Sequence, residues 1–344
     1  MKLIRNGFAR VAVAVAFLIT LVASAQAQPN GLGTGSCLVF PYVNASSGAE
    51  TLITITNTNR STEYCSQQDT RDGDVALHFV YVDGETLIAQ DLYDYLTPGD
   101  TNSYLVGRHN PSIEEGYLVI IASLFNVEQY GEAIDFDHLV GSALVVESGF
   151  DVVWSYQPYA FDAPYDPGRC ERIPTDIDQD GAVDFDGTEY SMLPDEIVID
   201  GFFEEGGVVT NRLALVSFAD RAHTSEVTMF IYNNVGQPTA TLFEMGGFWS
   251  GCLSDLSFAA EHLRGDPEEL SRQTGWVAIG GSRMLDRSGN AVRDASGGVA
   301  IAPVLGVFTQ FVEPLGLALG QSLHHSGALD GLEFFTGNGD PQQN

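Results

Sequence analysis

Five aspartates lie within the twelve residues DIDQDGAVDFDG, which run from residue 176 to residue 187. Asp176, Asp178 and Asp180 are separated by single residues, and Gly181 follows them. Alternate residues of a tightly curled loop point inward, and glycine permits the sharp turn that comes next. Calcium takes about six to eight oxygen ligands, several of them carboxylates. We therefore expect a Ca2+ ion in this loop rather than a solvated acidic turn.

The loop resembles the EF-hand loop and, more closely, its helix-poor relatives in thrombospondin type 3 repeats and dockerins. The similarity covers the loop alone and departs from the family at Gly187, where the family has a bidentate carboxylate. Asp186 or Glu189 would have to replace that ligand. The expected metal ligands are Asp176, Asp178, Asp180, the backbone carbonyl of Ala182, Asp184 and Asp186.

Residues 1–27 have the features of an export signal. Three basic residues accompany an apolar run over residues 11–24, and Ala25-Gln26-Ala27 has the small-x-small pattern of a cleavage site. We expect a secreted bacterial protein, periplasmic or extracellular, whose mature chain begins at Gln28. The apolar run is too short to span a bilayer, and no later stretch reaches about 18 apolar residues, so no transmembrane segment is expected.

The charge of the chain limits its partners. It has 15 basic and 46 acidic residues, and the signal contains three of the basic ones, so the mature net charge is 12 − 46 = −34. Such a surface repels nucleic acid and anionic membranes and attracts divalent cations. A marine or halophilic source, or a specific cationic partner, would explain it. The 44% hydrophobic content, with 20 Phe and 13 Tyr, predicts a folded core rather than disorder.

The four cysteines, Cys37, Cys65, Cys170 and Cys252, predict two disulfides in an exported chain. Three pairings are possible. Proximity in the sequence favours Cys37–Cys65 together with Cys170–Cys252.

Short strand-like runs separated by turn residues fill most of the chain. Apolar and polar residues alternate over residues 51–57, and the Asp-Gly pair in VDGE, residues 82–85, is typical of a hairpin. Three segments of the first half recur in the same order in the second. They are DVALHFVYVDGE with EVTMFIYNNVGQ, NPSIEEGYLVIIAS with DPEELSRQTGWVAIGGS, and HLVGSALVVES with PVLGVFTQFVE.

These patterns predict an all-β protein of two tandem antiparallel β-sandwich modules joined by an irregular calcium-binding connector. The expected boundaries are a signal at 1–27, modules at 28–165 and 195–335, the connector at 166–194 and a disordered tail at 336–344. A single larger sandwich with interleaved halves is the alternative.

Aromatic residues in DVVWSYQPYAF suggest a second kind of site. Trp154 and Tyr156 lie on one face of the predicted strand, and Tyr159 and Phe161 on the other. Exposed aromatic rings stack on sugar rings, whereas buried ones only pack. Phe248 and Trp249 carry the same ambiguity, so the sequence leaves carbohydrate binding and core packing open.

No catalytic motif emerges from the sequence. The serine of GFWSG lies one place too late for the G-x-S-x-G turn, and GQSLH lacks the second glycine. His324 and His325 are adjacent, so on a strand they face opposite ways and cannot bind one ion together. His78 is expected to be a satisfied wall residue.

The sequence therefore favours a secreted, non-enzymatic, calcium-binding protein with a structural, adhesion or ligand-binding role. Its expected partners are divalent cations and a carbohydrate or another cell-surface protein. A secreted carboxylate-dependent hydrolase acting on polysaccharide is the alternative. The stretch FPYVNASSGAETLITITNTN is similar to the opening of uncharacterised secreted bacterial β proteins, a likeness that implies no activity.

Overall fold

The computed structural model describes residues 33–65, 70–124, 132–147, 152–163, 173–176, 182–185, 187–194, 196–203, 209–218, 221–233, 238–256, 274–294, 297–312, 317–326 and 333–335. Regular structure in these residues is almost all β-strand, and the helical elements are α2 (Val106–His109) and the 3-10 turn η1 (Leu253–Asp255). No helix in this part of the chain is long and apolar enough to cross a membrane. The expected signal and tail lie outside the described residues.

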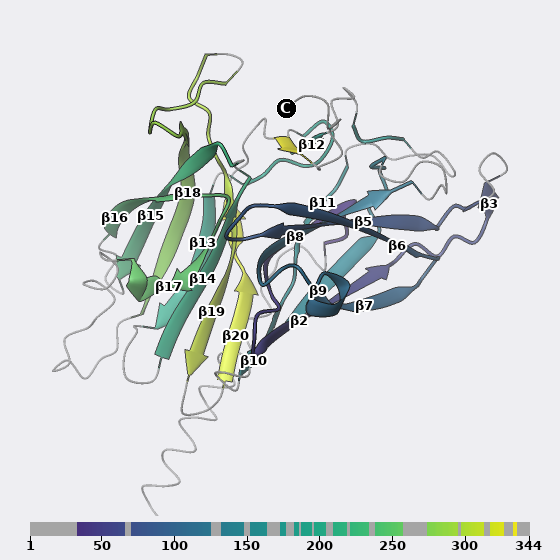
Figure 1. Cartoon of the computed structure of the whole chain (residues 1–344), viewed down its shortest axis with the longest axis horizontal. Helices are drawn as coiled ribbons and strands as arrows, with labels where there is room; N and C mark the ends of the chain where they lie inside the picture. Colours follow the sequence, from purple (N-terminus) through teal and green to yellow (C-terminus); the bar gives the residue numbers. More distant parts are fainter. Residues whose placement is uncertain are drawn as a thin grey trace, which may run out of the picture. The chain divides into compact units, whose positions relative to one another are not determined.

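Four antiparallel sheets account for most of the strands (Figure 1). Sheet 1 has the order β11-β1-β8-β5-β6, sheet 2 β10-β9-β2-β7, sheet 3 β16-β15-β18-β13-β21 and sheet 4 β17-β14-β19-β20. The expectation of an antiparallel all-β protein is confirmed. The strands of the first half are β1 (Cys37–Asn44), β2 (Ala49–Asn57), β5 (Val75–Asp83), β6 (Ala89–Leu96), β7 (Thr101–Leu105), β8 (Glu115–Ser123), β9 (Leu139–Glu147), β10 (Val152–Tyr156) and β11 (Tyr159–Phe161). Those of the second half are β13 (Glu196–Phe203), β14 (Val209–Ser217), β15 (His223–Asn233), β16 (Pro238–Met245), β17 (Phe248–Cys252), β18 (Thr274–Asp286), β19 (Val304–Val312), β20 (Leu317–Ser322) and β21 (His324–Ser326).

The second half repeats the strand order of the first. Read from one edge, β11, β1, β8, β5 and β6 correspond to β21, β13, β18, β15 and β16. In the smaller sheets β10, β9, β2 and β7 correspond to β20, β19, β14 and β17. The three segment pairs matched in the sequence fall on β5 and β15, β8 and β18, and β9 and β19. The internal repeat is therefore a repeat of strand order as well as of sequence.

The same irregularity occurs in both five-stranded sheets. The ladder of β1 with β8 shifts register within residues 40–43, and that of β13 with β18 shifts within residues 199–202. The first residue after each shift pairs with a glycine, Gly116 in sheet 1 and Gly275 in sheet 3. A bulge of this kind bends and twists its strand, so both copies bend at the same place.

The two glycines are required by the close approach of the next strand. A methyl group on Gly116 would lie 2.0 Å from the carbonyl oxygen of Val82, and one on Gly275 would lie 2.3 Å from that of Tyr232. Val82 pairs with Tyr117 and Tyr232 with Trp276, directly after each glycine. The ladders are therefore equivalent position by position around the bulge.

The cores do not form two separate tandem modules, in contrast to the expectation. One buried cluster lies between sheets 1 and 2, and another between sheets 3 and 4. The first cluster also contains Ala214, Val307 and Phe311 of sheet 4. Sheet 4 is thus buried on both faces, because one face packs on sheet 3 and the other on the first half.

The connector and the VDGE hairpin differ from the sequence expectations. The connector is not wholly irregular, since β12 (Ala182–Asp184) pairs with β22 (Glu333–Phe335). A further short pair joins β3 (Tyr64–Cys65) and β4 (Thr70–Arg71). The hairpin at VDGE is present, but its loop extends over residues 84–88 and places Leu87 at a φ of 53°, so it is longer than a two-residue Asp-Gly turn.

Replacement of either bulge glycine should destabilise the fold. We expect Gly116→Ala and Gly275→Ala each to lower the free energy of unfolding by about 1–3 kcal/mol, because backbone must move to admit the methyl group. Urea denaturation measures this loss. Gly246→Ala is the matched control, since its methyl group would meet nothing closer than Leu87 Cδ1 at 3.9 Å. Equal midpoints for the three variants would contradict the prediction.

Candidate functional site

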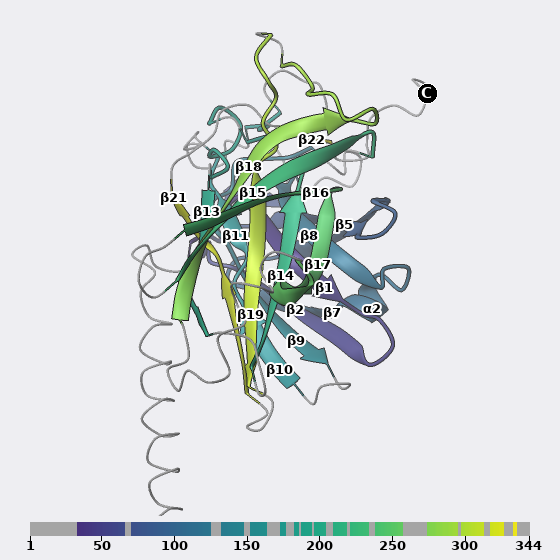
Figure 2. The same cartoon turned by 90° about the vertical axis from the view of Figure 1, so that its left-hand side faces the viewer.

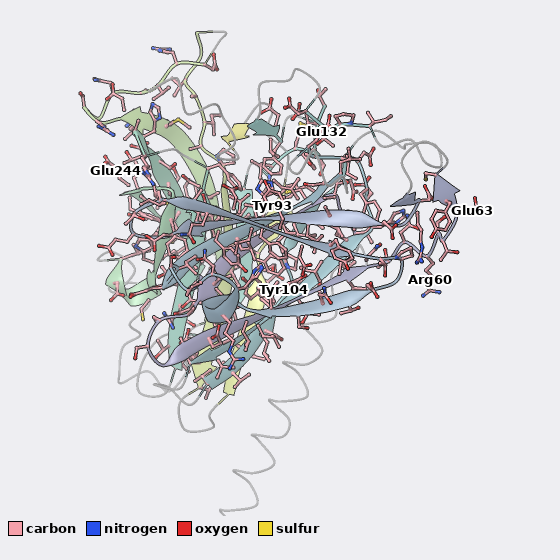
Figure 3. All side chains as sticks on the ribbon, turned by 45° about the vertical axis from the view of Figure 1, so that its right-hand side comes forward. Arg60, Glu63, Tyr93, Tyr104, Glu132 and Glu244 are labelled. Atoms are coloured by element: carbon pink, nitrogen blue, oxygen red, sulfur yellow. The ribbon has the colours of Figure 1, made fainter. Side chains whose placement is uncertain are left out.

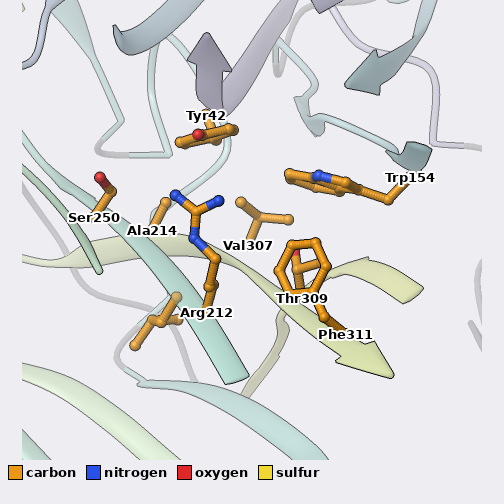
Figure 4. Close-up of a pocket in the computed structure, with 9 residues that line it drawn as sticks. Tyr42, Trp154, Arg212, Ala214, Ser250, Val307, Thr309 and Phe311 are labelled. Atoms are coloured by element: carbon orange, nitrogen blue, oxygen red, sulfur yellow. The ribbon is translucent and has the colours of Figure 1, made fainter. Parts of the chain in front are cut away.

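An ion pair between a buried glutamate and a partly buried arginine joins the two halves. Arg212 on β14 donates from Nη1 to Oε2 of Glu147, the last residue of β9, over 2.7 Å. Glu147 is only 4% exposed. Figure 4 shows the guanidinium group directed toward the ring of Tyr42 on β1. Two charges taken out of water in this way need further hydrogen bonds to offset their desolvation.

Those hydrogen bonds come from the first half. The hydroxyl of Tyr42 donates to Oε1 of Glu147 over 3.2 Å, and Nδ2 of Asn44 donates to the Tyr42 hydroxyl over 2.8 Å. The hydroxyl of Tyr156 donates to the backbone carbonyl of Tyr42. The network therefore holds β1, β9 and β10 against β14. We call Tyr42, Glu147, Trp154, Arg212 and Phe311 the seam.

Arg212 and Tyr42 of the seam both have raised pKa values. Burial lowers the pKa of Arg212, but Tyr42 and the carboxylates of Glu147 and Glu115 raise it, and the net shift is upward. Burial, followed by the charges of Glu115 and Glu147, raises the pKa of Tyr42 well above its usual range. Neither group exchanges a proton near neutral pH, so neither is suited to general acid–base catalysis.

A hollow of about 240 Å³, which includes solvent at its mouth, lies beside the seam. The space inside it that water can enter is about 10 Å³, room for about one water molecule. The guanidinium carbon of Arg212 lies 5.9 Å from the centroid of Phe311 at its wall. Trp154 Nε1 is buried and has no hydrogen-bond partner among the described residues. The hollow therefore has the size and lining of a gap in the packing between the halves.

An exposed apolar surface lies on the outer side of sheet 3, which Figure 2 turns toward the viewer. We call it the sheet 3 face and define it by Phe230, Tyr232, Leu242 and Trp276. Phe230 and Trp276 are each 38% exposed and Leu242 is 58% exposed. The rings of Tyr232 and Trp276 stack across the ladder, with centroids 4.0 Å apart and planes 2° from parallel. The four residues therefore form an exposed apolar surface on the outer side of sheet 3.

Carboxylates border this surface. Glu226 and Glu244 are opposite each other on β15 and β16, and Glu244 is exposed (Figure 3). Arg283 Nη2 donates to Glu226 Oε2 over 2.8 Å, so one cation accompanies the two carboxylates. Glu196 lies on the same side of β13, because its neighbour Ile197 faces the core. The border is net negative.

The equivalent surface of sheet 1 is covered. Tyr117, which corresponds to Trp276, is 4% exposed, and Val82, which corresponds to Tyr232, is also buried. They belong to a buried cluster with apolar residues of the connector and of the second half. Phe185 of the connector packs on Phe161 with ring centroids 4.6 Å apart. The covering residues are Val183, Phe185, Tyr190, Leu193, Val216, Phe218 and Leu305.

The predicted calcium ligands are only partly described. Asp178, Asp180 and Asp186 lie outside the described residues, whereas Asp176, Ala182 and Asp184 lie within them. No group of three or more metal-binding side chains occurs among the residues that the structure describes.

The turn that follows the loop brings two acidic residues together. Glu189, which is buried, accepts a hydrogen bond through Oε2 from the backbone N–H of Asp184 over 3.1 Å. The N–H of Tyr190 donates to the carbonyl of Asp184 over 3.0 Å, and Gly187 has a φ of 84°. The turn therefore needs the glycine that departs from the EF-hand pattern, and it folds Glu189 back toward the loop.

The aromatic residues predicted from DVVWSYQPYAF are packed, not exposed. Trp154 is 5% exposed and Tyr156 is buried beside it, with ring centroids 5.5 Å apart. The hydroxyl of Tyr159 donates to the backbone carbonyl of Gly306 over 2.8 Å and so ties β11 to β19. Sequence reasoning missed the sheet 3 face. The sequence does contain a signal for this face: in TMFIY, residues 228–232, both faces of β15 carry apolar side chains.

The other residues considered for chemistry have structural partners. His78 is buried, lies 2.8 Å through Nε2 from Asp91 Oδ1, and stacks on Tyr93, as expected of a satisfied wall residue. Ser250 of GFWSG donates its hydroxyl proton over 2.5 Å to Oε1 of Glu115, a carboxylate rather than a histidine. His324 and His325 lie on β21.

The cysteines correct the predicted pairing. Cys65 is disulfide-bonded, but Cys37 and Cys252 carry thiols. Both favoured pairs are therefore wrong, since Cys37–Cys65 needs the first thiol and Cys170–Cys252 needs the second. Cys170 lies outside the described residues. Cys37 is buried on the covered face of sheet 1, where burial raises the pKa of its thiol.

Comparison with known proteins gives no family. No family model and no curated protein matches the chain. Among solved structures, a lectin from Pleurotus ostreatus in its apo form is 10% identical, with a TM-score of 0.12, over 86% of this chain and 82% of the lectin. The lectin from Pleurotus ostreatus in complex with GalNAc covers the same shares at 10% identity and a TM-score of 0.11.

Breaking the seam should cost more than breaking an exposed ion pair. We expect Arg212→Met to lower the free energy of unfolding by about 3–5 kcal/mol, because Glu147 is left buried without its cation. The double variant Arg212→Met/Glu147→Leu should recover most of that loss in urea denaturation. Arg283→Met removes the partner of Glu226 at the surface and should have little effect. Equal losses for the two single variants would show that the seam is not a buried charge pair.

The thiol of Cys37 should react only after unfolding. We expect iodoacetamide to leave Cys37 unmodified in the native protein and to label it in denaturant, because its sulfur is buried. Peptide mapping without reductant should recover Cys65 in a disulfide-linked peptide. Recovery of Cys37 in such a peptide would overturn the assignment.

Proposed function

We propose that this chain is an exported, non-enzymatic binding protein that presents the sheet 3 face to a ligand. One observation carries the proposal. The two five-stranded sheets have equivalent outer faces, and the chain covers the face of sheet 1 with its own apolar residues while Phe230 and Trp276 of sheet 3 remain exposed. Apolar surface that a fold buries in one copy and leaves open in the other is available for a partner.

We infer that the four sheets are two copies of one nine-stranded unit, sheets 1 and 2 followed by sheets 3 and 4, and that sheet 4 also packs on the first copy. Four sheets also suit a four-bladed propeller, in which each blade is one repeat. The strand order supports two such units, because each unit spans two sheets and its chain passes repeatedly between them, although β5 and β6 lie in one sheet and β9 and β10 in the other. For example, β1 lies in sheet 1 and β2 in sheet 2.

A binding role fits the seam better than hydrolysis does. Glycosidases place two carboxylates roughly 5–10 Å apart with room for substrate between them. Glu147 is already bonded to Arg212 and Tyr42, and Glu115 to Ser250. These carboxylates hold the halves together, which supports a structural part for the seam within a binding protein.

The proposal includes a calcium ion in the loop over residues 176–187. The spacing of its aspartates supports this, as does the turn that brings Glu189 back to Asp184. Val183 and Phe185 help to cover sheet 1, and they follow Ala182 in the same segment. An ion there would stabilise the segment that covers the first face.

Calcium should therefore raise the melting temperature of the mature protein. An ion that binds only the folded state adds about 2.7 kcal/mol at a hundredfold excess over Kd, which corresponds to several degrees in a chain of this size. Thermal unfolding in millimolar calcium and in chelator, at constant high ionic strength, measures the shift. Asp178→Ala and Asp180→Ala should abolish it, and Glu85→Ala at the β5–β6 turn should not. An equal rise with magnesium, or none with calcium, would contradict the site.

Binding through the sheet 3 face is tested with arrayed probes. The mature protein is applied to neutral polysaccharides such as cellulose and chitin and to an array of synthetic peptides. We expect retention that Trp276→Ser and Leu242→Ser abolish. Val153→Ser is the control, because Val153 is 53% exposed on the outer side of sheet 2. Retention that survives both sheet 3 variants would refute the proposal.

A further inference from the structure

We infer that the partner of the sheet 3 face is an extended segment of another protein in which apolar and basic side chains alternate. The inference rests on the proposed function and names the class of its ligand. Three features of the face support it: the way the equivalent face is covered, the charge around it, and the shape of its centre.

The chain itself shows what kind of structure fits this surface. In sheet 1 part of the equivalent face is covered by connector residues such as Val183 and Phe185, from a segment with only three residues of strand, and the rest is covered by Val216, Phe218 and Leu305 of the second half. Phe185 stacks on Phe218 with centroids 5.5 Å apart, so aromatic side chains complete the layer. A polypeptide with apolar side chains at intervals is therefore the cover that this fold already uses.

Charge selects among polypeptide partners. The chain has a net charge of −31, and Glu196, Glu226 and Glu244 border the face with Arg283 as the accompanying cation. A second copy of the chain brings the same negative charge and is repelled. Nucleic acids and anionic lipids are repelled in the same way. Basic side chains at the edges of an apolar strip complement this border and speed association.

The centre of the face has a low strip between larger side chains. Phe230 on β15 is opposite Ala278 on β18, which is opposite Val198 on β13. Ala278 is buried and the next outward position on β18 is Gly280, so the outward residues of this part of β18 are small. An extended chain lying along β18 would pass over this strip of small residues.

The aromatic stack supplies a further contact for a cation. Tyr232 and Trp276 stack ring on ring, and Trp276 is 38% exposed. Arginine or lysine is attracted to the face of an exposed aromatic ring. A segment that carries basic residues beside its apolar ones therefore uses both parts of the surface.

Defined peptides test the inference. The probe is a fluorescein-labelled peptide in which valine and tyrosine alternate with arginine, and two matched peptides replace arginine by glutamate or the apolar residues by serine. Fluorescence anisotropy with the mature protein should show at least tenfold tighter binding of the first peptide than of either other. Raised salt should weaken that binding, and Glu244→Gln should reduce its dependence on salt.

Variants assign the binding to the face. Trp276→Ser and Leu242→Ser should each weaken binding at least tenfold with the melting temperature retained, and Val153→Ser should leave it unchanged. Equal binding of the acidic peptide, or full binding by Trp276→Ser, would overturn the inference. Retention on polysaccharide through Trp276 without peptide binding would refute this partner and leave the proposed function standing. If sedimentation shows that the protein self-associates and Trp276→Ser removes that association, the face binds a second copy of the chain and the inference is overturned.

Discussion

The register of both five-stranded sheets depends on one close contact between a glycine and the carbonyl oxygen of the neighbouring strand. Gly116 meets Val82 in sheet 1 and Gly275 meets Tyr232 in sheet 3, at approaches that admit no side chain. Because side chains alternate along a strand, the contact determines which residues face outward on both sides of it. The alternation places Tyr117 and Trp276 on equivalent outer faces, and the segments that pack against each sheet decide which of the two is covered.

The two copies differ in what lies against them. Sheet 4 packs on sheet 3 with one face and on the first half with the other, so the second copy supplies part of the first copy's surroundings. The seam between Arg212 and Glu147 and the hydroxyl of Tyr159 hold this junction with charged and polar contacts. Among the described residues, no other sheet packs in this way on the outer face of sheet 3. The chain thus buries one copy of the surface and leaves the other exposed, which is the basis of the proposed binding role.

Sequence reasoning reached the repeat and the strands because both leave local patterns. The Gly-aromatic pairs Gly116-Tyr117 and Gly275-Trp276 and the alternation in β2 are visible without coordinates. The seam could not be predicted, since Glu147 and Arg212 are distant in the sequence and their pairing depends on how the halves pack. The disulfide prediction failed for a similar reason, because proximity in the chain says nothing of Cys37 lying in a buried layer. The residues around Trp154 stayed open between packing and sugar binding, because the sequence gives the alternation of a strand but not which of its faces is covered.

The most direct test of the account compares the two equivalent faces in the native protein. Hydroxyl-radical footprinting with mass spectrometry measures the oxidation of individual side chains, and each copy offers its own internal control. The account predicts that Trp276, Phe230 and Leu242 are oxidised readily while Tyr117, the equivalent of Trp276, resists until the protein unfolds. Protection of Trp276 and Phe230 to the same degree as Tyr117 would show that the sheet 3 face is already covered, and would contradict a binding role for it.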